Sequence, residues 1–168
     1  MNTLGELVSS GKGEDTAIAA PDRQPLSYNL LRAQVDYTVS RLNDLGVGRN
    51  DPVAIVLPNG PEMASAFICI GAAATTAPLN PAYRGEEFDF YLEDLQPKLL
   101  VVEDSTDSPV VTSASKLGIN VVTLKHSESD PAGKFELIGE SINHNSPTPG
   151  LAQPSDIALV LHTSGTTS

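Results

Sequence analysis

The stretch Pro52-Val53-Ala54-Ile55-Val56-Leu57 indicates the fold of this 168-residue chain most clearly. It is apolar throughout, which is typical of a strand in a parallel sheet that helices cover on both faces. Pro58-Asn59-Gly60 then predicts a turn. Pro61 and Glu62 suit the first turn of a helix, because proline has a fixed φ and an acidic side chain favours the positive end of the helix dipole. We therefore expect a strand, a turn and a helix here.

Strands and helices alternate on both sides of this segment. Before it, we expect a strand at Thr16–Ala20, a turn at 21–24, and a helix that begins after Ser27 as its N-cap and ends at Gly46. After it, residues 75–81 predict a proline-bounded loop. The remaining elements are helices over 86–95 and 109–117 and strands at Leu99–Val102 and Val121–Leu124. This alternation predicts an α/β fold with a mostly parallel sheet flanked by helices on both faces.

The last third of the chain is organised differently. Residues 125–154 are rich in Ser, Asn, Pro and Gly and predict a long surface loop, with a short element at Phe135–Ile138. Ile157–His162 is an apolar run that predicts a buried strand. Because the carboxyl ends of parallel strands meet at one edge of a sheet, we expect the residues after this strand to lie at that edge.

Composition excludes several classes of protein. Hydrophobic residues make up 40% of the chain and charged residues 18%, which fits a globular protein, and the net charge of −11 argues against a nucleic-acid binder. The single cysteine, Cys69, permits neither a disulfide framework nor a zinc site within one chain, and we interpret it as a buried hydrophobe. The N-terminus lacks a secretory pattern and Met63–Leu79 is too short for a membrane span, so we predict a cytoplasmic protein without one.

The candidate binding residues form the end of the sequence, Thr163-Ser164-Gly165-Thr166-Thr167-Ser168. The hydroxyls and backbone N–H groups of such a loop are neutral donors for an anion, and glycine allows close approach of the backbone. The spacing fits neither the Walker A motif nor the dinucleotide fingerprint. From the residues alone, a phosphate-binding loop and a polar surface turn both remain open.

Four segments together resemble the adenylate-forming enzymes, a family of acyl-CoA synthetases, luciferases and adenylation domains. Leu161–Ser168 is similar to the start of the family's signature loop, hydroxyl-Ser-Gly-Thr-Thr-Gly-any-Pro-Lys; Ser168 replaces its glycine, and its Pro and Lys would follow residue 168. Leu57–Glu62, Ala77–Tyr83 and Glu86–Leu92 resemble further family segments in the same order. The third of these, and the serine at 168, most resemble the oxalate–CoA ligase branch. The resemblance covers residues 15–168.

This resemblance implies that residues 1–168 are the N-terminal portion of the large AMP-binding domain of an ATP-dependent acyl-CoA synthetase. Such an enzyme makes an acyl-adenylate from a carboxylate, here oxalate or a related small acid, and passes the acyl group to coenzyme A. It implies ATP, Mg²⁺ and coenzyme A as cofactors in the complete enzyme. Phosphate contacts are carried over to Thr163, Ser164, Gly165, Thr166, Thr167 and Ser168.

No catalytic residue and no metal ligand is assigned, and the isolated chain is expected to be inactive. One alternative is a non-catalytic α/β module that binds a nucleotide or a protein. Another expectation is that bare apolar surface makes the chain self-associate.

Several polar residues are not assigned to the site. His162 is interpreted as a structural histidine at a strand end, with an acyl-pocket role as the alternative. His126 and His144 are expected to be solvated in the polar loop, and the acids of the 86–95 helix to form a solvated face. Tyr83-Arg84 is interpreted as plain loop, with a contact to substrate or to a partner domain as the alternative.

Overall fold

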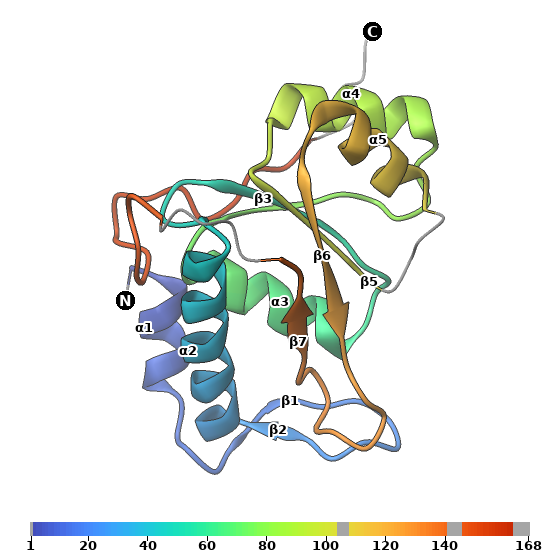
Figure 1. Ribbon diagram of the computed structural model, residues 1–168. Coiled ribbons are helices and arrows are strands. Elements are labelled where there is room, and N and C mark those ends of the chain that lie inside the picture. The colour runs from blue at the N-terminus through green and yellow to red at the C-terminus, as the bar shows by residue number, and fades with distance from the viewer. Residues whose placement is uncertain (1, 104–107, 141–145, 163–168) are drawn as a thin grey trace, which may run out of the picture.

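A computed structural model describes residues 2–103, 108–140 and 146–162 (Figure 1). Its larger sheet has the strand order β4-β3-β5-β6-β7, in which β7 is antiparallel to β6 and the other neighbours are parallel. The helices are α1 (Leu4–Ser10), α2 (Tyr28–Asp44), α3 (Pro61–Gly71), α4 (Gly85–Leu95) and α5 (Pro109–Leu117). The strands are β1 (Thr16–Ile18), β2 (Leu26–Ser27), β3 (Pro52–Val56), β4 (Thr75–Pro78), β5 (Leu99–Glu103), β6 (Asn120–Lys125) and β7 (Glu136–Ile138).

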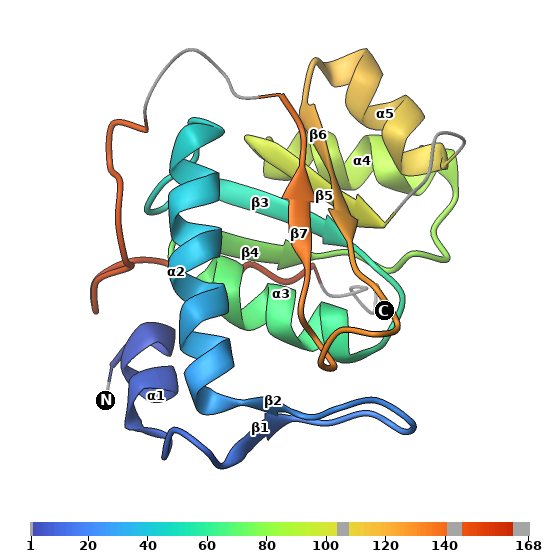
Figure 2. The same ribbon diagram turned by 60° about the horizontal axis from the view of Figure 1, so that its bottom comes forward.

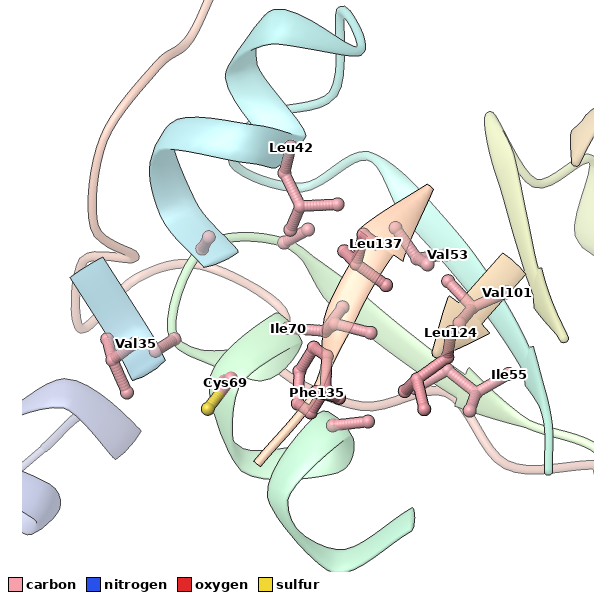
Figure 3. Close-up of a cluster of buried hydrophobic side chains, with 14 of the residues drawn as sticks. Val35, Leu42, Val53, Ile55, Cys69, Ile70, Val101, Leu124, Phe135 and Leu137 are labelled. Atoms are coloured by element: carbon pink, nitrogen blue, oxygen red, sulfur yellow. The ribbon is translucent and has the colours of Figure 1, made fainter. Parts of the chain in front are cut away.

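Helices cover both faces of the sheet, as the sequence predicts. Alternate side chains of β3 point to opposite faces: Val53 and Ile55 pack under α2 and α3, while Ala54 and Val56 pack under α4 and α5. Figure 2 shows these helix layers on either side of the strands, and Figure 3 shows the larger of the two clusters. Because both faces are buried, β3 and β5 have no polar face, which explains their continuous apolar runs.

Local signals place the helix ends correctly. The Ser27 hydroxyl accepts a hydrogen bond from the backbone N–H of Leu30 at 3.4 Å, which confirms it as the N-cap of α2. Gly118 ends α5 in the left-handed region, with φ 68°, and the predicted bounds of this helix are confirmed. Gln96 ends α4 with φ 47°, directly before Pro97.

The prediction of a loop over 75–81 was wrong for its first half. Thr75–Pro78 is β4, which pairs in parallel with β3. Thr75 and Thr76 look like loop residues because they are polar, yet their side chains are 2% and 0% exposed. The hydroxyls donate hydrogen bonds to the carbonyls of Ile157 and Ala158, at 2.6 and 2.8 Å, so their burial leaves no unpaired donor.

The long loop predicted over 125–154 is only partly a surface loop. Within its described residues, Ala132, Phe135 and Leu137 are buried and the latter two belong to the larger core cluster (Figure 3). The short element predicted at Phe135–Ile138 is confirmed as β7, which pairs with β6 through Leu124 and Leu137. A strand of three residues is too short to give a periodic signal in a polar segment. The strand predicted at Thr16–Ala20 is confirmed as β1, which pairs in a separate sheet with β2, a strand that was not predicted.

The segment Ile157–His162, predicted to be a buried strand, is largely exposed, so this prediction was wrong about its burial. The segment makes a single parallel bridge, between Leu159 and Thr76 of β4, and lies at the edge of the sheet. Ile157, Leu159 and Leu161 are 57%, 39% and 59% exposed. The direction was correct, because the bridge is parallel, and the segment therefore runs toward the edge where β3 and β4 end.

No helix in the described part of the chain is long and apolar enough to cross a membrane.

Replacing Leu137 by Ala should lower the free energy of unfolding by about 2–4 kcal/mol, because Leu137 is buried and its removal leaves a cavity. Replacing the neighbouring Ile138, which is 46% exposed, by Ala should cost less than about 1 kcal/mol. Urea denaturation followed by circular dichroism measures both. Equal small costs would show that β7 is not part of the core.

Candidate functional site

The six predicted binding residues, Thr163 to Ser168, lie outside the described residues. The structure does describe the segment that precedes them in the chain, residues 156–162. Three sets of contacts hold this segment to the fold, at its start, its middle and its end.

The start is held by the carboxylate of Asp156. It accepts hydrogen bonds from the Arg49 guanidinium through both oxygens, at 2.6 and 3.1 Å, from the Asn50 side chain at 2.9 Å and from the Gln153 backbone at 2.7 Å. The Arg49 hydrogen bonds, followed by that of the Gln153 N–H, hold the pKa of Asp156 well below its ordinary range. Asn50 also accepts from the Ile157 N–H at 2.8 Å. This cluster joins the β3 entrance loop to the beginning of the segment.

The middle is held by β4. The Thr76 N–H donates to the Ala158 carbonyl and the Thr76 carbonyl accepts from the Val160 N–H, both at 2.9 Å. The two threonine hydroxyls of β4 bond to the carbonyls of Ile157 and Ala158, as described above. The segment is therefore parallel to β4 and runs toward the edge formed by the carboxyl ends of the strands. In open α/β sheets this edge is where ligands bind.

The end is held by the side chain of His162. Its Nε2 lies 2.9 Å from Oδ2 of Asp94, and its ring centroid lies 4.9 Å from that of Tyr91. Both partners come from α4. The ring is therefore packed on a helix, which agrees with the structural interpretation of His162.

A cavity of about 250 Å³ opens at the same edge of the sheet, beyond β3, β5 and β6. His126 lines this cavity, with Nε2 3.1 Å from Oε1 of Glu103, and its side chain is 21% exposed. The expectation that His126 is solvated was therefore wrong.

Arg23 also lines the cavity. It donates hydrogen bonds to Glu62 at 2.6 Å and to the carbonyl of Pro131 at 3.2 Å, and so connects the β1–β2 loop to the start of α3. Lining residues include Leu57, Asn59, Glu103, Leu124 and His126.

Sequence reasoning missed Arg49 and Asp156 and did not identify the partners of Asp94 and His126. The two members of each pair are 107, 68 and 23 residues apart, so nothing in the local sequence marks the contact. The interpretation of Cys69 as a buried hydrophobe is confirmed: it is fully buried, and burial raises the pKa of its thiol to about 12. Among the described residues, no group of three His, Cys, Asp or Glu side chains could hold a metal ion. His144 lies outside the described residues.

Comparison with known proteins matches the sequence of this chain to one family. The sequence profile of the family described as AMP-binding enzyme matches residues 7–168. The chain is 39% identical, over 178 residues, to the oxalate–CoA ligase of Arabidopsis thaliana, with 95% of this chain and 33% of that protein covered. It is 40% identical to the probable CoA ligase CCL9 of Humulus lupulus, over 148 residues that cover 85% of this chain and 28% of that protein. The oxalate–CoA ligase of Saccharomyces cerevisiae is 39% identical over 146 residues, which cover 73% of this chain and 26% of that protein.

Solved structures share the fold. Apo MatB from Rhodopseudomonas palustris superposes with a TM-score of 0.73 at 24% identity, over 100% of this chain and 34% of that one. The o-succinylbenzoate CoA synthetase MenE from Bacillus subtilis superposes with a TM-score of 0.69 at 20% identity. The match covers 100% of this chain and 40% of that one. The chain spans 26% to 33% of the length of these three curated relatives.

The Asp156 cluster predicts a pH-dependent contribution to stability. Its folded-state pKa lies below the unfolded value of about 3.9, so its contribution is fully present above about pH 4 and is lost as the pH falls toward the folded-state pKa. The difference in unfolding free energy between wild type and Asp156→Asn should be constant from about pH 5 upward and should shrink below about pH 4. Urea denaturation at a series of pH values measures this difference. A difference that grew on acidification would contradict the assignment.

Proposed function

Because this chain belongs to the family of AMP-binding enzymes, we propose that it is the N-terminal part of an AMP-forming acid–thiol ligase. In this proposal a carboxylate attacks the α-phosphorus of ATP, the bond to the departing pyrophosphate breaks, and an acyl-adenylate forms. The sulfur of coenzyme A then attacks the acyl carbonyl and AMP leaves. Oxalate or a related small acid is the leading substrate, since two relatives with 39% identity are oxalate–CoA ligases. We place the enzyme in the cytoplasm.

One observation carries the proposal: the pairing of residues 158–160 with β4 is parallel. The described chain therefore runs toward the carboxyl edge of the sheet, where α/β proteins bind nucleotides. We propose that Thr163, Ser164, Gly165, Thr166, Thr167 and Ser168 hold the β- and γ-phosphates of ATP there. Their neutral donors stabilise the negative charge that grows on the departing pyrophosphate. Serine at 168 keeps a donor where the family pattern has glycine.

The metal in this proposal comes with the nucleotide. Mg²⁺ bound to nucleotides takes most of its ligands from phosphates and water. It supplies positive charge to the phosphate oxygens. The described residues offer no cluster of three ligands for it, and the proposal assigns this chain no metal ligand. What the chain contributes is binding and orientation of the phosphates.

The proposed partners are the carboxylate, ATP and coenzyme A, with no role for nucleic acid. Self-association of the chain is a further proposal. Ile157, Leu159 and Leu161 support it, because they expose apolar side chains along an edge segment that pairs with β4 on one side.

The phosphate-binding role predicts that the chain binds inorganic pyrophosphate. Thr166→Val should weaken this binding roughly tenfold, since a hydrogen bond to a charged group is worth about 1.5–3 kcal/mol. Thr112→Val, at an exposed position of α5 outside the proposed binding residues, removes a hydroxyl of the same type and should leave the affinity unchanged. Isothermal titration calorimetry measures the pyrophosphate affinity of wild type and of the two variants. Equal affinities for the Thr166 variant and wild type would refute the role of the loop.

The isolated chain should release no pyrophosphate from ATP. The proposal assigns it phosphate contacts and no catalytic residue, and the chain spans about a third of its ligase relatives. A coupled assay with ATP, Mg²⁺ and a panel of carboxylates that includes oxalate measures release, with Thr166→Val as the background control. Turnover well above that control would overturn this part of the proposal.

A further inference from the structure

A pocket opens at the amino edge of the sheet, opposite the edge toward which residues 156–162 run. It has a volume of about 580 Å³ and is lined by the C-terminal ends of α4 and α5, which pack against each other (Figure 1). Lys98 and Ile119, which directly precede β5 and β6, also line it. Its volume lies within the range of small-molecule sites, about 300–1,000 Å³. We call it the interhelix pocket.

The walls of the interhelix pocket are largely apolar. Leu117, in the last turn of α5, lines the pocket and is 43% exposed, whereas Val110 and Ala114 of the same helix are fully buried. Pro97 and Ile119 add apolar lining beside it. Leu117 therefore contributes apolar surface to the pocket that the core does not use, and a ligand with an apolar body would remove this surface from water.

The charge at the interhelix pocket is negative. Both helices end there, and the last carbonyls of a helix give its C-terminus a partial negative charge. The last turn of α4 contains no basic residue that would offset this charge. The carboxylate of Glu93 lines the pocket and adds a full negative charge, and it has no hydrogen-bond or ion-pair partner among the described residues.

The lysines nearest to the interhelix pocket are already paired. Lys98 donates to Asp51 at 3.1 Å, and Lys116, in the last turn of α5, donates to Asp89 at 2.9 Å. Their positive charges are compensated by these carboxylates, so the charge of Glu93 and of the two helix ends stays unbalanced. A cation complements such a pocket, whereas a carboxylate or a phosphate is repelled from it.

We propose that the interhelix pocket binds a small organic ammonium ion, that is, a protonated amine with an apolar body. The ammonium group donates hydrogen bonds to the Glu93 carboxylate and to carbonyls at the helix ends, while the apolar body packs on Leu117 and Pro97. ATP, coenzyme A and a carboxylate substrate are anions and do not fit this chemistry. The pocket is therefore a second site, and it does not rest on the proposed function.

Four probes separate the contribution of the charge from that of the apolar body. Phenethylammonium carries both, 2-phenylethanol has the apolar body without the charge, and methylammonium has the charge without the body. The fourth probe, 3-phenylpropionate, combines the apolar body with a negative charge. Each is titrated into the chain and followed by the backbone amide chemical shifts. Phenethylammonium should give saturable shifts within residues 92–98 and 117–120, and the other three should bind about fivefold more weakly or worse.

Two variants with matched controls test the two parts of the pocket. Glu93→Gln removes the charge and keeps the shape of the side chain, so phenethylammonium should bind about two- to fivefold more weakly. Glu86→Gln, in the first turn of the same helix, should leave the affinity unchanged. Leu117→Ala removes part of the apolar wall and should weaken binding about three- to tenfold. Leu30→Ala on α2, where Leu30 is 46% exposed, is its matched control.

Several results would overturn the proposal. One is that 3-phenylpropionate binds as tightly as phenethylammonium, and another is that phenethylammonium gives no saturable shifts in residues 92–98 and 117–120. Equal affinities for methylammonium and phenethylammonium would show general attraction of cations to an acidic surface and would count against the pocket. Wild-type affinity in both Glu93→Gln and Leu117→Ala would do the same. Circular dichroism of each variant checks that the fold is kept, and the four probes test the wild-type chain independently of the variants.

Discussion

The backbone of Thr76 joins the end of the described chain to the sheet, and the arrangement of the candidate site depends on it. Its N–H and C=O bond to Ala158 and Val160 with parallel geometry. An antiparallel pairing would have sent the following residues to the amino edge, away from the ends of β3 and β5. The parallel direction is therefore the constraint that makes a nucleotide site at residues 163–168 structurally reasonable.

This pairing is specific because several independent contacts agree with it. The hydroxyls of Thr75 and Thr76 need acceptors once they are buried, and the carbonyls of the segment supply them. The Asp156 carboxylate sets the register at the start of the segment through Arg49 and Asn50. A shift by one residue would break the threonine and carboxylate contacts together, so the register is determined more strongly than a single bridge suggests.

Much of the fold follows from local signals in the sequence, whereas the site follows mainly from long-range contacts. The apolar runs of β3 and β5 and the cap at Ser27 depend on residues within a few positions, and their predictions are confirmed. β4 was missed because the burial of Thr76 depends on Ala158, which is 82 residues away. His126 was misjudged for the same reason, since Glu103 reaches it from a neighbouring strand. The predicted phosphate contacts at 163–168 stay predictions.

The two edges of the sheet differ in whether side chains occupy their backbone groups, and this determines at which edge another strand can pair. The free edge of β7 is closed by side chains of α2: Gln34 donates to the Phe135 carbonyl at 2.9 Å, Tyr37 accepts from the Leu137 N–H at 3.0 Å, and Arg41 donates to the Leu137 carbonyl at 3.1 Å. These bonds occupy groups that would otherwise pair with another strand. At the opposite edge the apolar side chain of Leu159 is partly exposed, and β4 pairs with its segment from one side. A strand that extends this sheet should therefore join beside Leu159 and not beside β7.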